Sequence, residues 1–169
     1  MEIASENLRI IPLTLGHFEL LLHSTHEMEQ ALHLSPGSHE LDEHTKQAME
    51  GLYQQALQSG QDYIWYTNWQ IILKSANISI GSACFMGRPN ERQEVEIGYG
   101  INEDFQNKGY ITEAVRAICD WAFSQPTVTC IIAQTEKDNI PSHRVLQKCG
   151  MERYKETEEG LWWRLESSV

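Results

Sequence analysis

Residues 106–113, QNKGYITE, determine the predicted fold. The apolar segment Val95 to Ile101 before them predicts a strand, and the segment Glu113 to Phe123 after them predicts a helix. The first N–H groups of a helix lack internal partners, and the helix dipole favours negative charge there. Gly109 lets the main chain approach an anion closely and can take a positive φ. We therefore predict a phosphate-bearing ligand at this loop.

The rest of the chain adds strands and helices on both sides of this loop. The expected helices are Leu15–Met28, capped by Thr14, Leu41–Gln58, Glu113–Phe123 and Ile140–Lys148. The expected strands are Leu8–Leu13, Tyr63–Lys74, Asn77–Gly87, Glu91–Ile101, Thr127–Ala133, Met151–Thr157 and Leu161–Glu166. Three consecutive strands with short loops favour an antiparallel meander, and the last two favour a hairpin. This order predicts an α+β fold with a mixed sheet, in one domain over residues 1–169.

Composition narrows the function classes. The formal net charge of −11 argues against a nucleic-acid surface, because such a surface needs Lys and Arg to replace phosphate counterions. It suits an amine or basic-peptide substrate, although solubility alone would also explain it. The acidic N-terminus is unlike a signal peptide, and no apolar run approaches the roughly 20 residues of a membrane helix. The four scattered cysteines fit reduced thiols, so a cytoplasmic location is expected.

The flanks of the loop carry a family resemblance. Glu96–Ile101 (EIGYGI) followed by Gln106–Ala114 (QNKGYITEA) resembles the acetyl-CoA loop of the GNAT superfamily of N-acetyltransferases, whose pattern is Gln/Arg-x-x-Gly-x-Gly/Ala. Asn139–Ser142 through Lys148–Met151 resembles the family's second cofactor segment. Asn7–Leu13 resembles the first strand of the ribosomal-protein N-terminal acetyltransferase (RimJ/RimL-like) branch. The resemblance implies a three-layer fold with a seven-stranded, mostly antiparallel sheet, helices on both faces, and a splay between its fourth and fifth strands, Glu91–Ile101 and Thr127–Ala133.

The resemblance also assigns cofactor residues. It places the main-chain N–H groups of about Lys108 to Thr112 on the phosphates of acetyl-CoA. Thr112 would cap the helix, bond a phosphate oxygen, or do both. Ile111 departs from the family pattern, so its side chain must point away from the phosphates or the loop must open slightly. The implied cofactor-binding residues are Tyr99, Ile101, Gln106, Asn107, Lys108, Gly109, Tyr110, Ile111, Thr112, Asn139 and Ser142. A glycine turn that only starts a helix is the alternative, as is a simple helix cap for Asn139.

Two acid–base roles remain to be filled. In many family members a glutamate at the position of Glu96 is the proposed base, and burial with a neighbouring carboxylate would raise its pKa. Orienting the amine, or pairing with an arginine, is the other role for Glu96, and Glu94 is the weaker candidate base. The family's usual acid is a tyrosine at the position of Leu146. Because that tyrosine is absent, we assign to Ser142 the hydrogen bond or proton that stabilises the leaving thiolate, and Tyr110 and Tyr154 are the other candidates. Ser142 could equally serve only as a helix-start residue after Pro141.

Histidines and tryptophans allow further interpretations. His23 and His26 lie one helical turn apart, but no carboxylate or cysteine pattern completes a metal site, so no metal is expected. The histidines fit a solvated helical face or the substrate entrance. Tryptophans at 65, 69, 162 and 163 fit core packing better than a cleft lining.

The predicted function is therefore acetyl-CoA-dependent transfer of an acetyl group to a primary amine by direct attack in a ternary complex. The acceptor is a protein N-terminal amine or, alternatively, a small-molecule amine. A non-catalytic acyl-CoA-binding sensor is a second hypothesis, since Leu146 replaces the usual acid. No nucleic-acid or membrane partner is expected, and the chain would act as a monomer or homodimer.

Overall fold

The computed structural model describes residues 1–37 and 39–168. Its strands form one sheet in the order β1-β2-β3-β4-β5-β6-β8-β7, and all neighbours are antiparallel except β5 and β6. The strands are β1 Ile3–Ala4, β2 Leu8–Pro12, β3 Asn68–Leu73, β4 Ile78–Phe85, β5 Glu94–Ile101, β6 Cys130–Thr135, β7 Glu152–Thr157 and β8 Gly160–Glu166. The α-helices are α1 Leu15–His23, α2 Thr25–Ala31, α3 Glu43–Gln58, α4 Tyr110–Phe123 and α5 Ile140–Lys148. Two 3₁₀ turns, η1 Gly60–Trp65 and η2 Glu103–Phe105, complete the described elements.

The sheet confirms the predicted mixed α/β architecture and its central meander. Strands β3, β4 and β5 pair antiparallel in sequence order, and β7 and β8 form the expected hairpin. The described sheet has eight strands and not seven, because Ile3–Ala4 folds back and pairs with Arg9–Ile10. This short edge strand was not predicted, because the acidic first residues lack the apolar pattern of a strand.

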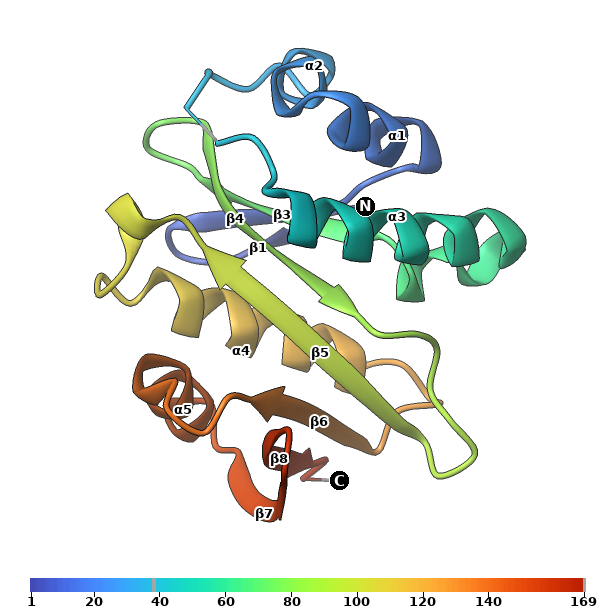
Figure 1. The fold of residues 1–169 in the computed structure, drawn as a ribbon, viewed down its shortest axis with the longest axis vertical. Helices are drawn as coiled ribbons and strands as arrows, with labels where there is room; N and C mark the ends of the chain where they lie inside the picture. Colours follow the sequence, from blue (N-terminus) through green and yellow to red (C-terminus); the bar gives the residue numbers. More distant parts are fainter. Residues whose placement is uncertain (38, 169) are drawn as a thin grey trace.

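Helices cover the two faces of the sheet (Figure 1). α1, α2 and α3 gather on one side, where Leu13, Phe18 and Leu52 form a core cluster with Cys84 of β4. α4 lies on the other side, where Val115 and Ile118 join the larger cluster. That larger cluster includes the tryptophans at 65, 69 and 163, each less than a tenth exposed, so the core reading of these side chains is confirmed.

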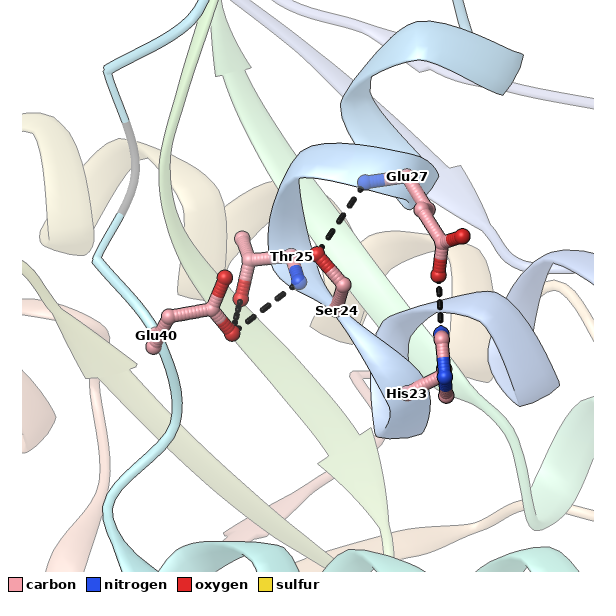
Figure 2. Close-up of polar contacts among 5 residues, drawn as sticks. All are labelled: His23, Ser24, Thr25, Glu27 and Glu40. Carbon is pink, nitrogen blue, oxygen red and sulfur yellow. Dashed lines mark hydrogen bonds and ion pairs between the residues drawn. The ribbon is translucent and has the colours of Figure 1, made fainter.

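One predicted helix, Leu15–Met28, is wrong in its continuity. The chain is extended at Ser24, with φ −163° and ψ 127°, and this residue ends α1 and begins α2. Figure 2 shows why the break is stable: the Glu40 carboxylate accepts hydrogen bonds from the Thr25 N–H at 3.1 Å and from its hydroxyl at 3.2 Å. Such a carboxylate at a helix start complements unpaired N–H groups and the dipole. His23 and Glu27 pair across the break.

Other predicted boundaries shift because tertiary contacts or caps override local preference. The predicted strand Tyr63–Lys74 begins only at Asn68, since η1 turns Trp65 into an aromatic cluster with Phe85 and Trp121. α3 begins after Asp42, whose side chain accepts from the Thr45 N–H at 2.7 Å. α4 begins three residues before the predicted Glu113, and β6 starts and ends later than Thr127–Ala133.

The four cysteines carry free thiols, and Cys84, Cys119 and Cys130 are buried as small core residues. Across the described residues, no helix has both the length and the apolarity needed to cross a membrane.

Candidate active site

The sheet opens at the end of β5. Its parallel pairing with β6 runs from Glu94 opposite Cys130 to Ile97 opposite Ala133, and no further pair is described along these two strands. β5 continues to Ile101 and stays paired with β4, whereas β6 continues to Thr135 and stays paired with β8. The two strands therefore part after Ile97, which confirms the predicted splay between the fourth and fifth strands of the sequence analysis.

The backbone beyond Ile97 directs its polar groups into this opening. The Glu96 carbonyl accepts from the Met86 N–H at 2.9 Å, and the Asn102 N–H donates to the Ile80 carbonyl at 2.8 Å, so even-numbered residues bond toward β4. Strand alternation then turns the main-chain groups of Tyr99 and Ile101 toward the open side. The Gln106 side-chain amide reaches the Ile101 carbonyl at a long 3.5 Å. An extended edge of this kind can pair with an amide-bearing arm.

The loop before α4 forms an anion cradle, which we define as residues 107–112. Asn107 and Gly109 both have positive φ, at 62° and 83°, and Gly109 is the helix N-cap without a side-chain bond. Within the described chain, the N–H groups of residues 107–112 have no hydrogen-bond partner, and the first bond of the turn is from Glu113 N–H to the Gly109 carbonyl. These donors lie at the start of a fourteen-residue helix, the positive end of its dipole, which favours an anion.

Side chains of the cradle lie away from these donors or at its rim. The Ile111 and Tyr110 side chains pack against the main core, which is one of the two outcomes expected for the branched residue at 111. Lys108 holds its ammonium 5.7 Å from the centre of the Phe105 ring, and Gln106 is exposed. Thr112 is not the helix cap, since Gly109 takes that position; its carbonyl accepts from the Cys149 thiol at 3.7 Å.

Glu96 lies on the opposite face of β5 from Tyr99 and is half-buried. Burial raises the pKa of its carboxyl above the ordinary value, and no neighbouring carboxylate contributes to that shift. Among the described residues, the carboxylate has no hydrogen bond or ion pair, so pairing with an arginine is not observed. Glu94, by contrast, accepts from the Asn90 side-chain amide at 3.2 Å and closes the β4–β5 turn. Glu94 is thus engaged in the turn, whereas no such contact is described for the Glu96 carboxylate.

The start of α5 faces the open side of β5. The Asn139 side chain caps the helix, with its oxygen 3.2 Å from the Ser142 N–H, and so the cap reading of Asn139 is observed. The Ser142 hydroxyl lies 2.6 Å from the Tyr99 hydroxyl, across the opening. Leu146 is fully buried, so its position points into the core. Burial raises the pKa of Tyr99 to about 12, despite the hydrogen bond with Ser142.

Tyr99 is among the cofactor-binding residues that the family resemblance implies, but no role for its side chain was predicted from the sequence. Alternation along β5 places that side chain on the face opposite Glu96. Its partner lies 43 positions away, and nothing local in the sequence signals that contact. Of the reserve tyrosines, Tyr154 is 43 % exposed and lies under the Arg164 guanidinium, away from Ser142.

The histidines of the first helices form no metal centre in the described chain, where no group of three or more metal-ligating side chains is brought together. His23 instead pairs with Glu27 on the outer surface of α1 and α2 (Figure 2). That contact matches the solvated-face reading for this residue.

Comparison with known proteins adds family information. The model of the acetyltransferase (GNAT) domain matches residues 7–152. An uncharacterized N-acetyltransferase, YjdG, of Bacillus subtilis (strain 168) is 36 % identical over 85 residues, which cover 50 % of this chain and 51 % of YjdG. The matched segment thus spans about half the length of this curated relative.

Solved structures share the whole fold at low identity. The ribosomal L7/L12 α-N-protein acetyltransferase RimL, in complex with coenzyme A, superposes with a TM-score of 0.70 at 16 % identity and 98 % coverage of both chains. AAC(6')-Ib, in complex with ribostamycin and coenzyme A, gives a TM-score of 0.62 at 17 % identity, covering 95 % of this chain and 94 % of that one. At these identities the likeness is one of fold.

Proposed function

Because the chain belongs to the acetyltransferase (GNAT) domain family, we propose that it is an N-acetyltransferase that moves the acetyl group of acetyl-CoA to a primary amine. The observation that carries this proposal is the anion cradle at residues 107–112, whose unpaired N–H groups follow the part of β5 that no longer pairs with β6. A diphosphate and an amide-bearing arm are the two parts of coenzyme A that such a cradle and such an edge would bind.

Cofactor binding then follows from main-chain groups. The diphosphate oxygens accept from the N–H groups of the cradle, and Gly109 keeps the approach open, since no atom lies within 4 Å of the place where a Cβ would stand. The pantetheine arm pairs with the free edge at Tyr99 and Ile101. The Asn139 amide nitrogen, which the cap leaves available, donates to the same arm. The thioester is thereby aimed through the opening toward the face that carries Glu96.

Chemistry takes place in a ternary complex. Glu96 accepts the proton of the amine, directly or through a water, and its raised pKa suits a base that works near neutral pH. The main-chain N–H groups of Tyr99 and Ile101 polarise the acetyl carbonyl as the amine attacks. Ser142 supports the thiolate as coenzyme A leaves.

For the acceptor, we propose the amino terminus of a peptide or protein. The base lies next to exposed apolar surface, because Met86 is 53 % exposed and its methyl group covers Gly98, beside Glu96. Tyr154 is also partly exposed and feels the charge of Glu96. Apolar surface beside an acidic group suits the first residue of a peptide, whose side chain would contact the apolar surface while its α-amine lies at the carboxylate. RimL, named for a ribosomal-protein amino terminus, shares the fold.

A small amine is the second candidate acceptor, and AAC(6')-Ib with its bound ribostamycin shares the same fold. The buried Leu146 keeps a third reading, a coenzyme A sensor without catalysis, open to test.

One experiment separates these readings. Calorimetry measures coenzyme A binding, and a thiol reagent then follows coenzyme A release from acetyl-CoA with a panel of short peptides and small amines, including an aminoglycoside. Faster release with free-amine peptides than with N-blocked peptides supports the proposal. Release only with small amines moves the acceptor to the second candidate, and binding without release identifies a sensor. Absence of coenzyme A binding refutes the cofactor site itself.

A further inference from the structure

The Tyr99 and Ser142 hydroxyl groups form a hydrogen bond between β5 and α5, with their oxygens 2.6 Å apart, although the residues are 43 positions apart in sequence. The Tyr99 hydroxyl also lies 3.5 Å from the Ser142 main-chain carbonyl, to which it donates at the limit of hydrogen-bond distance. Tyr99 stands two residues beyond the last β5–β6 pair, and Ser142 lies in the first turn of α5. The bond therefore lies beside the part of β5 that no longer pairs with β6, where the proposed function, on which this inference rests, places the thioester.

Packing and a helix cap restrict the positions of both residues. The Tyr99 ring is half-buried and packs against the main core, which restricts where its hydroxyl can lie. The Ser142 main chain is fixed by its bond to the Asn139 cap at 3.2 Å. Burial raises the pKa of Tyr99 to about 12, so the phenol keeps its proton at neutral pH and remains a donor.

Donor counting then limits what this pair can do. A serine hydroxyl has one hydrogen and a phenol has one hydrogen. When the phenol donates to Ser142 Oγ, the serine hydrogen is free for a third atom, and hydrogen bonds in such a chain strengthen each other. That freed hydrogen can then be donated to a sulfur atom beside Ser142.

We propose that Tyr99 is a positioning residue for the leaving group: it donates to Ser142 Oγ, and Ser142 in turn donates to the sulfur of coenzyme A. As the amine nitrogen bonds to the acetyl carbon, the carbon–sulfur bond breaks and its electron pair stays on sulfur. The amine proton leaves through Glu96. The Ser142 hydrogen bond stabilises the thiolate until solvent protonates it, and Tyr99 keeps its own proton throughout. This pair takes the place of an acid at Leu146, which is buried in the core.

The test compares coenzyme A with desulpho-coenzyme A, which lacks only the sulfur. Calorimetry on the wild-type chain should show tighter binding of coenzyme A, by about five- to tenfold for one hydrogen bond to sulfur. Tyr99→Phe and Ser142→Ala should each remove most of this preference while binding desulpho-coenzyme A as the wild type does. The double variant should lose no more than either single variant, because the two residues act in series.

Turnover supplies the second readout. Tyr99→Phe should lower kcat by about tenfold and leave KM for acetyl-CoA within about twofold, since the contact acts on the leaving sulfur. Tyr63→Phe is the matched control, because this half-buried tyrosine lies on η1, outside the proposed site. It should change neither the preference nor kcat.

The outcomes distinguish failure of this inference from failure of the proposed function. If wild type and Tyr99→Phe prefer coenzyme A over desulpho-coenzyme A equally, the positioning role is wrong while the cofactor site stands. Additive losses in the double variant would also overturn it, because the residues would then act independently. If neither compound binds the wild type, the proposed function itself fails.

Discussion

Replacing Glu96 by glutamine tests the assignment of the base most directly. Glutamine keeps the size and hydrogen-bonding shape of the side chain but cannot accept the amine proton. General bases contribute about 100-fold to 10,000-fold to rate, so kcat of Glu96→Gln should fall by at least about 100-fold at neutral pH. The affinity for coenzyme A should stay within about twofold, because the Glu96 side chain lies on the face of β5 opposite Tyr99 and makes no described hydrogen bond to residues 107–112.

The pH profile gives this prediction a sign. Burial raises the pKa of Glu96 above the ordinary glutamate value of about 4.3, and a base works only when deprotonated. The wild-type kcat/KM should therefore be present above that raised pKa and should fall as the pH drops through it. The residual activity of Glu96→Gln should lack this acidic limb.

Stability gives an independent readout with the opposite direction. A carboxyl whose folded pKa is raised contributes stability that is fully present below its unfolded pKa and is lost as the pH rises through the folded pKa. Glutamine carries no such loss, so at neutral pH Glu96→Gln should have a Tm equal to or above that of the wild type. A lower kcat with a higher Tm cannot be explained by misfolding.

Glu94→Gln is the matched control, because Glu94 lies on the same strand face and bonds Asn90 in the turn. It should keep kcat within about threefold of the wild type, in line with a surface hydrogen bond. An unchanged kcat in Glu96→Gln, or an equal loss in Glu94→Gln, would refute the reasoning.

Three further predictions address the cradle, its support and the missing acid. Gly109→Ala, at φ 83°, should cost about 1–2 kcal/mol and weaken coenzyme A binding at least about fivefold by calorimetry, whereas Gly51→Ala in the exposed part of α3 should stabilise by about 0.5–1 kcal/mol. Glu113→Ala removes three hydrogen bonds to the N-terminal arm and should lower the denaturation free energy by about 1–3 kcal/mol at neutral pH. Burial raises the pKa of Glu113, but these hydrogen bonds lower it by more, so the folded pKa lies below the ordinary value. The stability that Glu113 contributes should therefore vanish as the pH falls through that lowered pKa, and a loss of stability independent of pH would contradict this. Leu146→Tyr should destabilise by about 1–3 kcal/mol in thermal melts without raising kcat, and a gain in kcat would show that the position reaches the sulfur.

Much of the fold could be predicted because the local signals agree with the tertiary arrangement. α5 has the predicted bounds, since Asn139 caps it, Pro141 stands in its first turn and Gly150 follows its end with φ 88°. The meander followed from short loops between β-branched segments. Where prediction failed, a distant contact decided: Glu40 stabilises the break at Ser24, and the aromatic cluster turns Trp65 out of the expected strand.

The candidate site divides in the same way. Gly109 and the helix after it identify the anion cradle from sequence, and the alternation of β5 places Glu96 and Tyr99 on opposite faces. Which glutamate has a free carboxylate could not be predicted, because that depends on Asn90 bonding Glu94. Ser142 was identified through the family resemblance, but its partner was not.

The sequence by itself determined most helices and strands in their order, the helix start with unpaired N–H groups after Gly109 and the family resemblance, because backbone donors, glycine conformations and strand alternation are local properties. Tertiary structure alone decided where β5 and β6 part and that the Tyr99 hydroxyl meets Ser142 across that opening. The physical reason is that these features depend on how far apart two segments lie once the sheet has twisted and the helices have packed. Residue type and spacing along the chain do not encode that distance.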